Sequence, residues 1–292
     1  MKLLEWFYLL TGRVAFLVSF SHFWILMLMD AGVMKLLQRV QSYFFPDSKP
    51  LRTNTFFLFH KFVRMGMYFC GTKVVTDYPK DFDFDSDAAL VLANHTNRFD
   101  PLPIIISVPG EISFLAKAEA LKIPVLRVLL ELAGTIPIER AHRDEARASI
   151  GVAAKFLRSG RHVCIFPEGT RNKQAEAEGG KLLPLKMGAF HCASEAGRRI
   201  VLMRCEGMTR AWPDKGILPR AGTVRLRIIS IIPPNETANA DPRELQKKVA
   251  AAFEEDKWRL PETEKQPFFN ACLALGYLLL SSVPLWLLAK LI

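Results

Sequence analysis

A histidine and an aspartate five residues apart are the first pair in this sequence that could do chemistry. They are His95 and Asp100, in the segment Asn-His-Thr-Asn-Arg-Phe-Asp-Pro that follows an apolar strand predicted at 88–93. Functional sites in open α/β sheets lie beyond the carboxyl ends of strands. A tight turn would let the Asp100 carboxylate bind one ring nitrogen of His95, which leaves the other nitrogen to take a proton from a hydroxyl group. Such pairs also occur in purely structural settings, so the spacing alone does not establish a general base.

A second polar segment, Phe-Pro-Glu-Gly-Thr-Arg at 166–171, follows another apolar run. Gly169 lets the backbone approach a ligand closely, and Thr170 with the neighbouring N–H groups can bind oxygens. Arg171 can hold a phosphate through two parallel hydrogen bonds. Glu168 could bind a hydroxyl group or position a cationic partner. The alternative is a strand-ending turn with solvated charges.

Two further segments carry basic residues beside a predicted strand end or helix start. Arg140 ends the segment 134–140, where it could bind a second phosphate oxygen, with an exposed ion pair as the alternative. Lys186 opens a helix predicted at 186–196, whose N-terminus could favour an anion or simply be a helix start. Three predicted strand ends therefore carry polar groups, in the order His/Asp, Glu/Arg and Gly/Thr/Arg.

The elements that must position these groups alternate between strand and helix. This alternation predicts an α/β domain with a mixed, largely parallel sheet flanked by helices. The cap and first-turn proline at Asp241-Pro242 predict the start of the last helix. The predicted strands are 88–93, 112–116, 135–138, 162–166, 200–203 and 224–232, and the predicted helices are 121–132, 144–157, 186–196 and 241 to about 258.

The composition indicates a globular domain with membrane-seeking segments. Half of the residues are hydrophobic and the mean hydropathy is +0.14, although 23% are charged. The net charge of +10 and the pI of about 9.5 suit an anionic partner. Because the chain is so hydrophobic and carries no nucleic-acid motif, anionic membrane lipids are favoured over nucleic acid. The five cysteines are scattered, which suggests neither a disulfide framework nor a zinc site.

Three parts are expected along the chain: an N-terminal membrane-associated helical region at 1–67, a globular domain at 68–262 and a hydrophobic helix at 266–292. No charged residue occurs from 268 to 289. As a helix this run would reach roughly 33 Å, enough for a bilayer core of about 30 Å. A buried core helix is the alternative.

The polar segments together resemble the glycerolipid acyltransferase family, whose best-known members acylate lysophosphatidic acid. Asn94, His95 and Asp100 match the first family block, although Asn97 stands where serine is usual. The third block is matched throughout 166–171. The resemblance spans about residues 88–205.

The second and fourth family blocks are matched with one departure each. In the second, at 134–140, Pro137 stands where phenylalanine is usual. In the fourth, at 200–203, Arg204 replaces a proline. These departures leave the base intact, but they bear on the acceptor because both blocks border its pocket in the family.

The resemblance implies that His95, oriented by Asp100, is the general base that moves a fatty acyl group from acyl-CoA or acyl-carrier protein to the free hydroxyl of 1-acylglycerol 3-phosphate, forming phosphatidate. No cofactor and no metal is expected, because a thioester is already reactive. Lys186 is also expected to bind the acceptor, because it opens a predicted helix whose N-terminus could favour an anion. The residues expected to bind the acceptor's phosphate and glycerol are then Arg140, Glu168, Gly169, Thr170, Arg171 and Lys186.

The same resemblance implies a membrane enzyme, expected at the bacterial inner membrane with its catalytic domain on the cytoplasmic side. Other acceptors for the same chemistry stay open: a lysophospholipid, a lyso-ornithine lipid or glycerol 3-phosphate. A membrane esterase, in which the His/Asp pair activates water, and a non-catalytic basic membrane binder are the remaining alternatives.

Overall fold

The computed structural model describes the chain from residue 71 to 261 with gaps, together with scattered positions before it. It divides into two compact units, one of residues 74–217 and 223–263 and one of residues 1–73, 218–222 and 264–292. The described positions before residue 69 are all helical. Described are 14, 39–40, 43–44, 60–61, 63–64, 66–68, 71–122, 127, 130–131, 133–139, 142–213 and 222–261.

Both predicted hydrophobic ends fall largely or wholly outside these ranges. Most of 1–67 and all of 266–292 are among the residues that are not described. Within the described ranges, no helix is long and apolar enough to cross a bilayer. The membrane segments therefore stay predictions.

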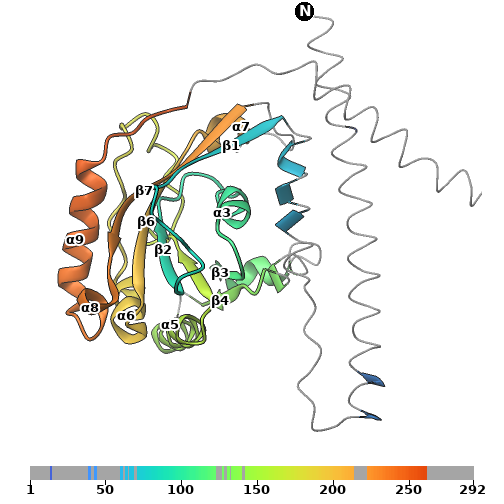
Figure 1. Ribbon diagram of the computed structural model, residues 1–292, viewed down its shortest axis with the longest axis vertical. Helices are drawn as coiled ribbons and strands as arrows, with labels where there is room; N and C mark the ends of the chain where they lie inside the picture. The colour runs from blue at the N-terminus through green and yellow to red at the C-terminus, as the bar shows by residue number, and fades with distance from the viewer. Residues whose placement is uncertain are drawn as a thin grey trace, which may run out of the picture. The chain divides into compact units, whose positions relative to one another are not determined.

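A seven-stranded sheet forms the centre of the larger unit, in the order β1-β7-β6-β2-β5-β3-β4 (Figure 1). The five strands from β6 to β4 run parallel, and β7 is antiparallel to β6. The predicted mixed, largely parallel sheet is confirmed. The strands are β1 (Thr72–Asp77), β2 (Ala89–Ala93), β3 (Ile112–Lys117), β4 (Ile136–Ile138), β5 (His162–Ile165), β6 (Arg199–Glu206) and β7 (Gly222–Ile232).

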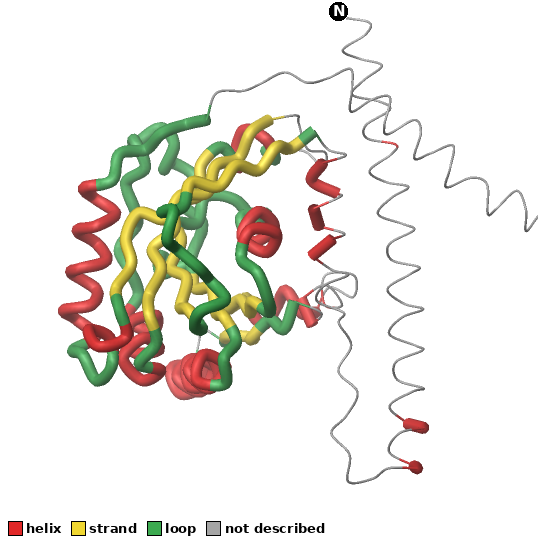
Figure 2. The backbone as a smooth tube through the Cα atoms, viewed as in Figure 1, coloured by secondary structure: helices red, strands yellow, loops and turns green. Residues whose placement is uncertain are grey.

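Helices cover both faces of this sheet (Figures 1 and 2). On one face lie α5 (Arg143–Arg158), α6 (Met187–Ala196) and α9 (Pro242–Glu255), and on the other lies α3 (Pro101–Ser107). All five residues of β2 are buried, as expected of a parallel strand covered on both sides. Leu90 and Leu92 join the core of the α5, α6 and α9 face, so the alternating Val91 and Ala93 face the α3 side.

The helix start at Asp241-Pro242 is confirmed. The Asp241 Oδ1 atom accepts a hydrogen bond from the Arg243 N–H at 2.9 Å, and Pro242 is the first helical residue. The helix ends at Glu255, before the predicted end near Trp258, because Asp256 takes an extended backbone conformation and its carboxylate binds two arginines.

Several shorter elements complete the fold. A 3₁₀ helix spans Ala118–Lys122, where the predicted helix 121–132 begins, and most of that predicted helix is not described. Two one-turn helices follow β6 and β7: α7 (Met208–Ala211) and α8 (Pro234–Thr237). The strand β6 runs three residues beyond the predicted end at 203.

The chain changes direction at the neighbouring strands β2 and β5. From β2 it passes through α3 on one face to β3, and from β5 it passes through α6 on the opposite face to β6 on the other side of β2. Adjacent parallel strands whose connections leave on opposite faces open a crevice at their carboxyl ends, where ligands bind in α/β sheets. A ligand site is therefore expected at the residues just after Ala93 and Ile165.

Candidate functional site

His95 and Asp100 lie in direct contact just after β2. The Nδ1 atom of His95 is 3.0 Å from the Oδ2 atom of Asp100. The His95 side chain is 18% exposed, whereas that of Asp100 is fully buried. Because an ionised carboxylate can only accept, Nδ1 carries the proton and donates it. The lone pair of Nε2 is then left to accept a proton from a substrate.

The buried carboxylate of Asp100 is held by several donors besides the imidazole. The backbone N–H groups of Thr96 and Asn97 donate to Oδ2 at 2.7 and 2.8 Å. The Thr96 hydroxyl and the Cys205 thiol lie 3.4 and 4.0 Å from Oδ1. Burial, and then the charge of Asp100, raise the pKa of the Cys205 thiol, so it stays protonated and can donate. A buried carboxylate needs such partners, and here they also fix its orientation toward His95.

Two asparagines shape the turn that carries this pair. The Asn94 amide accepts from the Cys205 N–H at 2.7 Å and donates to the Cys205 carbonyl at 2.9 Å, which extends the β2–β6 ladder by one residue. Asn97 is fully buried. Its Oδ1 atom accepts from the Phe99 N–H at 3.0 Å, and its amide donates to the Trp212 carbonyl. Both asparagine side chains therefore serve the local fold.

The segment after β5 reaches the same place through Phe166. Its ring stacks on the imidazole of His95, with centroids 4.2 Å apart and planes 17° apart. The imidazole is thus held at its edge by Asp100 and on one face by Phe166. The polar segments 94–101 and 166–171 therefore meet at the carboxyl ends of the neighbouring strands β2 and β5.

Glu168 is buried in the protein, in contact with the backbone of His95. Its side chain is 1% exposed. One oxygen accepts from the N–H of His95 and the other from the N–H of Leu183, both at 2.8 Å. Burial raises the pKa of Glu168, and the two N–H groups oppose that rise. The carboxylate expected to bind a hydroxyl group is therefore engaged with the protein backbone.

The other expected ligands of this segment lie at the surface of the turn. Gly169 has φ +68°, and a Cβ atom there would come within 3.1 Å of the Lys186 Cγ atom, so the lysine stem lies against this glycine. The Lys186 N–H donates to the Pro167 carbonyl at 2.7 Å, where α6 begins. Thr170 and Lys186 are exposed and Arg171 is half-buried. Gly169, Thr170 and Arg171 thus lie in a turn that binds the His95 backbone through Glu168 and Asn172, and Lys186 lies against Gly169.

Arg140, the remaining expected acceptor ligand, lies outside the described residues. It follows β4, which is separated from β5 by β3 in the sheet. Its role stays a prediction.

Asn172 is a buried polar residue that sequence reasoning missed. Its N–H donates to the His95 carbonyl at 2.6 Å, and its side-chain amide donates to the Lys181 carbonyl at 2.7 Å. It directly follows the segment 166–171, but nothing in its type distinguishes it from an exposed loop asparagine. Its partners are backbone groups, which a sequence does not locate.

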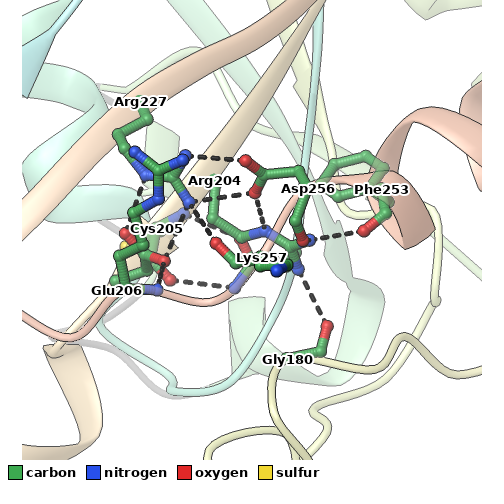
Figure 3. A network of polar contacts seen from close by, with 10 residues as sticks. Gly180, Arg204, Cys205, Glu206, Arg227, Phe253, Asp256 and Lys257 are labelled. Atoms are coloured by element: carbon green, nitrogen blue, oxygen red, sulfur yellow. Dashed lines mark hydrogen bonds and ion pairs between the residues drawn. The ribbon is translucent and has the colours of Figure 1, made fainter.

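Arg204, a departure from the resemblance, lies in a buried polar network with Asp256 (Figure 3). Its neighbour Cys205 faces Asp100, and successive side chains of a strand face opposite sides of the sheet. The Arg204 guanidinium is fully buried on the α9 side. It donates to Asp256 at 3.0 Å and to the carbonyls of Gly180 and Phe253 at 2.8 and 2.6 Å. The expectation that this departure bears on an acceptor pocket is therefore not supported by its position.

A second arginine completes this buried network (Figure 3). Arg227 on β7 forms two hydrogen bonds of 3.0 Å to Glu206 and others of 2.7 and 2.9 Å to Asp256. Two arginines and two carboxylates thus balance in charge. They join β6 and β7 to the end of α9.

A pocket of about 310 Å³ opens at the other end of the strands. His162, in its wall, accepts at Nδ1 from the N–H of Ala89 at 3.0 Å, at the start of β2, whereas His95 follows the end of β2. This pocket is not part of the His95 site. Its lining residues are Phe84, Asp85, Asp87, Ala88, Gly110, Glu111, Gly160 and His162. Within the described ranges, no three His, Cys, Asp or Glu side chains are grouped to hold a metal ion.

Comparison with known proteins finds similarity to a family of acyltransferases. The family model described as Acyltransferase matches residues 74–206. A curated relative from Salmonella typhimurium, named 1-acyl-sn-glycerol-3-phosphate acyltransferase, is 31% identical over 211 residues, which cover 71% of this chain and 80% of the relative. One of the same name from Borreliella burgdorferi is 29% identical over 147 residues. That match covers 50% of this chain and 56% of the relative.

A solved structure shares the fold. The crystal structure of the 1-acyl-sn-glycerophosphate (LPA) acyltransferase from Thermotoga maritima matches with a TM-score of 0.59 and 21% sequence identity. The match covers 85% of this chain and 95% of that chain.

Proposed function

Because the chain belongs to the glycerolipid acyltransferase family, a family of O-acyltransferases, we propose that it transfers a fatty acyl group from a thioester to the free hydroxyl of 1-acylglycerol 3-phosphate, forming phosphatidate. The observation that carries the proposal is the 3.0 Å contact between His95 and the buried, pre-oriented carboxylate of Asp100. It lies at the crevice where α/β sheets bind ligands.

In the proposed reaction, His95 Nε2 takes the proton of the acceptor hydroxyl as its oxygen attacks the thioester carbonyl. Asp100 stabilises the imidazolium that forms. The tetrahedral intermediate then breaks its carbon–sulfur bond, and the imidazolium returns the proton to the leaving thiolate. The new ester and a free thiol result, with no covalent acyl-enzyme. The donor thiol is that of coenzyme A or of an acyl-carrier protein.

The acceptor phosphate is proposed to bind at the turn after β5. Arg171, Thr170 and Lys186 lie there with Gly169, and the start of α6 adds a favourable dipole. Arg140 is proposed as a further phosphate ligand. Of the three departures from the family pattern, Asn97 and Arg204 are bound within the protein, so they give no reason to favour a different acceptor.

Because both acyl chains are insoluble in water, the site is proposed to work at a membrane surface, the cytoplasmic face of a bacterial inner membrane. The uncharged run at 268–289 and the net charge of +10 support this placement.

Lipid mass spectrometry of a reaction with purified protein tests the proposed activity. One acyl-CoA and one acyl-carrier protein are each paired with 1-acylglycerol 3-phosphate, a lysophospholipid, a lyso-ornithine lipid and glycerol 3-phosphate. Phosphatidate is the expected product. Free fatty acid released at the same rate without any acceptor would contradict transfer and indicate an esterase.

Arg171→Ala is expected to raise the KM for the acceptor by about 10- to 100-fold, because a charged hydrogen bond to phosphate contributes about 1.5–3 kcal/mol. The kcat should change much less. Steady-state kinetics with saturating donor measure both constants. Arg158→Ala is the matched control, since Arg158 is an exposed arginine at the end of α5 that pairs with Glu195. An unchanged acceptor KM in Arg171→Ala would remove its phosphate role.

A further inference from the structure

The backbone of His95 is held on both sides by the segment that follows β5. Its N–H donates to the Glu168 carboxylate at 2.8 Å, and its carbonyl accepts from the Asn172 N–H at 2.6 Å. Both polar groups of the His95 peptide are therefore fixed by residues more than seventy positions away in the sequence. The direction of the His95 side chain follows from this backbone, because the Cβ atom is carried by it.

Glu168 also ties this point to the far end of its own loop. Its second oxygen accepts from the Leu183 N–H at 2.8 Å. Between Asn172 and Leu183 the loop is closed by the hydrogen bond of 2.7 Å from the Asn172 amide to the Lys181 carbonyl. One buried carboxylate thus joins the turn after β2 to both ends of the loop after β5.

The Glu168 carboxyl group in this position has little capacity left for a substrate. Each oxygen already accepts one backbone N–H, and the side chain is 1% exposed. A hydroxyl group of the acceptor would have to displace these bonds in a buried space. The groups at the surface of the same turn, Thr170 and Lys186, are open to an acceptor in a way that Glu168 is not.

We propose that Glu168 is a positioning residue, which holds the His95 backbone so that the imidazole stays between the Asp100 carboxylate and the Phe166 ring, and that it is not a ligand of the acceptor. This inference rests on the proposed function of His95 as the base. It replaces the role in acceptor binding that the family resemblance implies for Glu168. A shift of about 1 Å in such a group can cost about 100-fold in rate.

Glu168→Gln replaces one carboxyl oxygen by an NH₂ group and keeps the shape of the side chain. The glutamine oxygen can still accept from one N–H, whereas its NH₂ group faces the other N–H, so one of the two bonds is lost. The expected result is a fall in kcat of about 100-fold with the acceptor KM within about twofold of wild type. Glu178→Gln is the matched control: it makes the same change on an exposed side chain in the same loop, and its kinetics should be those of wild type. An acceptor KM raised by more than about tenfold with a nearly unchanged kcat would overturn the proposal, because it would identify a ligand of the acceptor.

Glu168→Asp separates position from charge. It keeps the carboxylate but shortens the side chain by one methylene group, so the two N–H groups can no longer both be reached. A positioning role predicts that kcat falls here as well. Recovery of wild-type kcat in Glu168→Asp would overturn the proposal, because the charge alone would then suffice.

Amide hydrogen exchange tests the same contacts without any activity. In the wild-type protein the N–H groups of His95 and Leu183 should exchange slowly, and in folded Glu168→Gln at least one of them should exchange at least about tenfold faster. The N–H groups of Leu90 and Leu92, within β2, are the internal control and should not change. Fast exchange at both His95 and Leu183 in the wild-type protein would overturn the proposal even if no variant folds. A failure of the proposed function, in contrast, would appear as absent acyl transfer with this protection intact.

Discussion

His95→Ala is expected to lower kcat by roughly 10²- to 10⁴-fold, the range that a positioned general base contributes. Without the imidazole, the described groups that contact the Asp100 carboxylate are backbone N–H groups, a hydroxyl and a thiol that donate to it, and none of them could serve as the base. The loss should be in kcat rather than in acceptor KM, because His95 acts on the reacting proton and not on the phosphate. Single-turnover measurement of phosphatidate formation gives the rate of the chemical step directly.

In His95→Ala, a loss of activity can be distinguished from a loss of stability. The His95 side chain is partly exposed and makes one hydrogen bond and one ring contact. Its removal should therefore lower the thermal unfolding temperature only slightly, while kcat falls strongly. His191→Ala is the matched control, because His191 is an exposed histidine on α6. Turnover by His95→Ala within about threefold of wild type would remove the base assignment.

The sequence predicts six of the seven described strands, and the clearest of them are buried on both faces of the sheet. Ala89–Ala93 and residues 163–165 of β5 are continuous apolar runs because helices cover both sides of a parallel strand. The strand β1, Thr72–Asp77, was not predicted. It lies at the edge of the sheet with most of its residues at least partly exposed, so it lacks both a continuous apolar run and a regular alternation.

The contact between His95 and Asp100 could be predicted because it depends on spacing within one turn. The roles of the residues around them could not. Glu168 and Asn172 act on backbone groups of His95, and a sequence does not indicate which N–H or carbonyl group lies near a side chain. The partners of Arg204 could not be predicted for the same reason, because two of them are the backbone carbonyl groups of Gly180 and Phe253.

Asp256→Asn is expected to lower the free energy of unfolding by about 3 kcal/mol near neutral pH, the lower end of the cost of breaking a buried ion pair. Asp256 binds both Arg204 and Arg227, whose side chains are 1% and 7% exposed. Its loss leaves two buried arginines with one carboxylate, Glu206, between them. Denaturant unfolding measures the change. Glu244→Gln is the matched control on the same helix, because its pair with Lys247 is exposed and should contribute less than about 0.5 kcal/mol.

The pH dependence of that difference identifies the ion pair as its cause. Burial acts to raise the pKa of Asp256, but hydrogen bonds from Arg227 and Arg204 outweigh it and hold the pKa below the ordinary value. A carboxyl group whose pKa is lower in the folded state stabilises the protein fully above its unfolded pKa, and this stabilisation is lost as the pH falls through the folded pKa. The difference between wild type and Asp256→Asn should therefore be largest near neutral pH and shrink below about pH 4. A difference that stays constant into acid would attribute the effect to packing or to lost hydrogen bonds, since neither depends on the charge of Asp256.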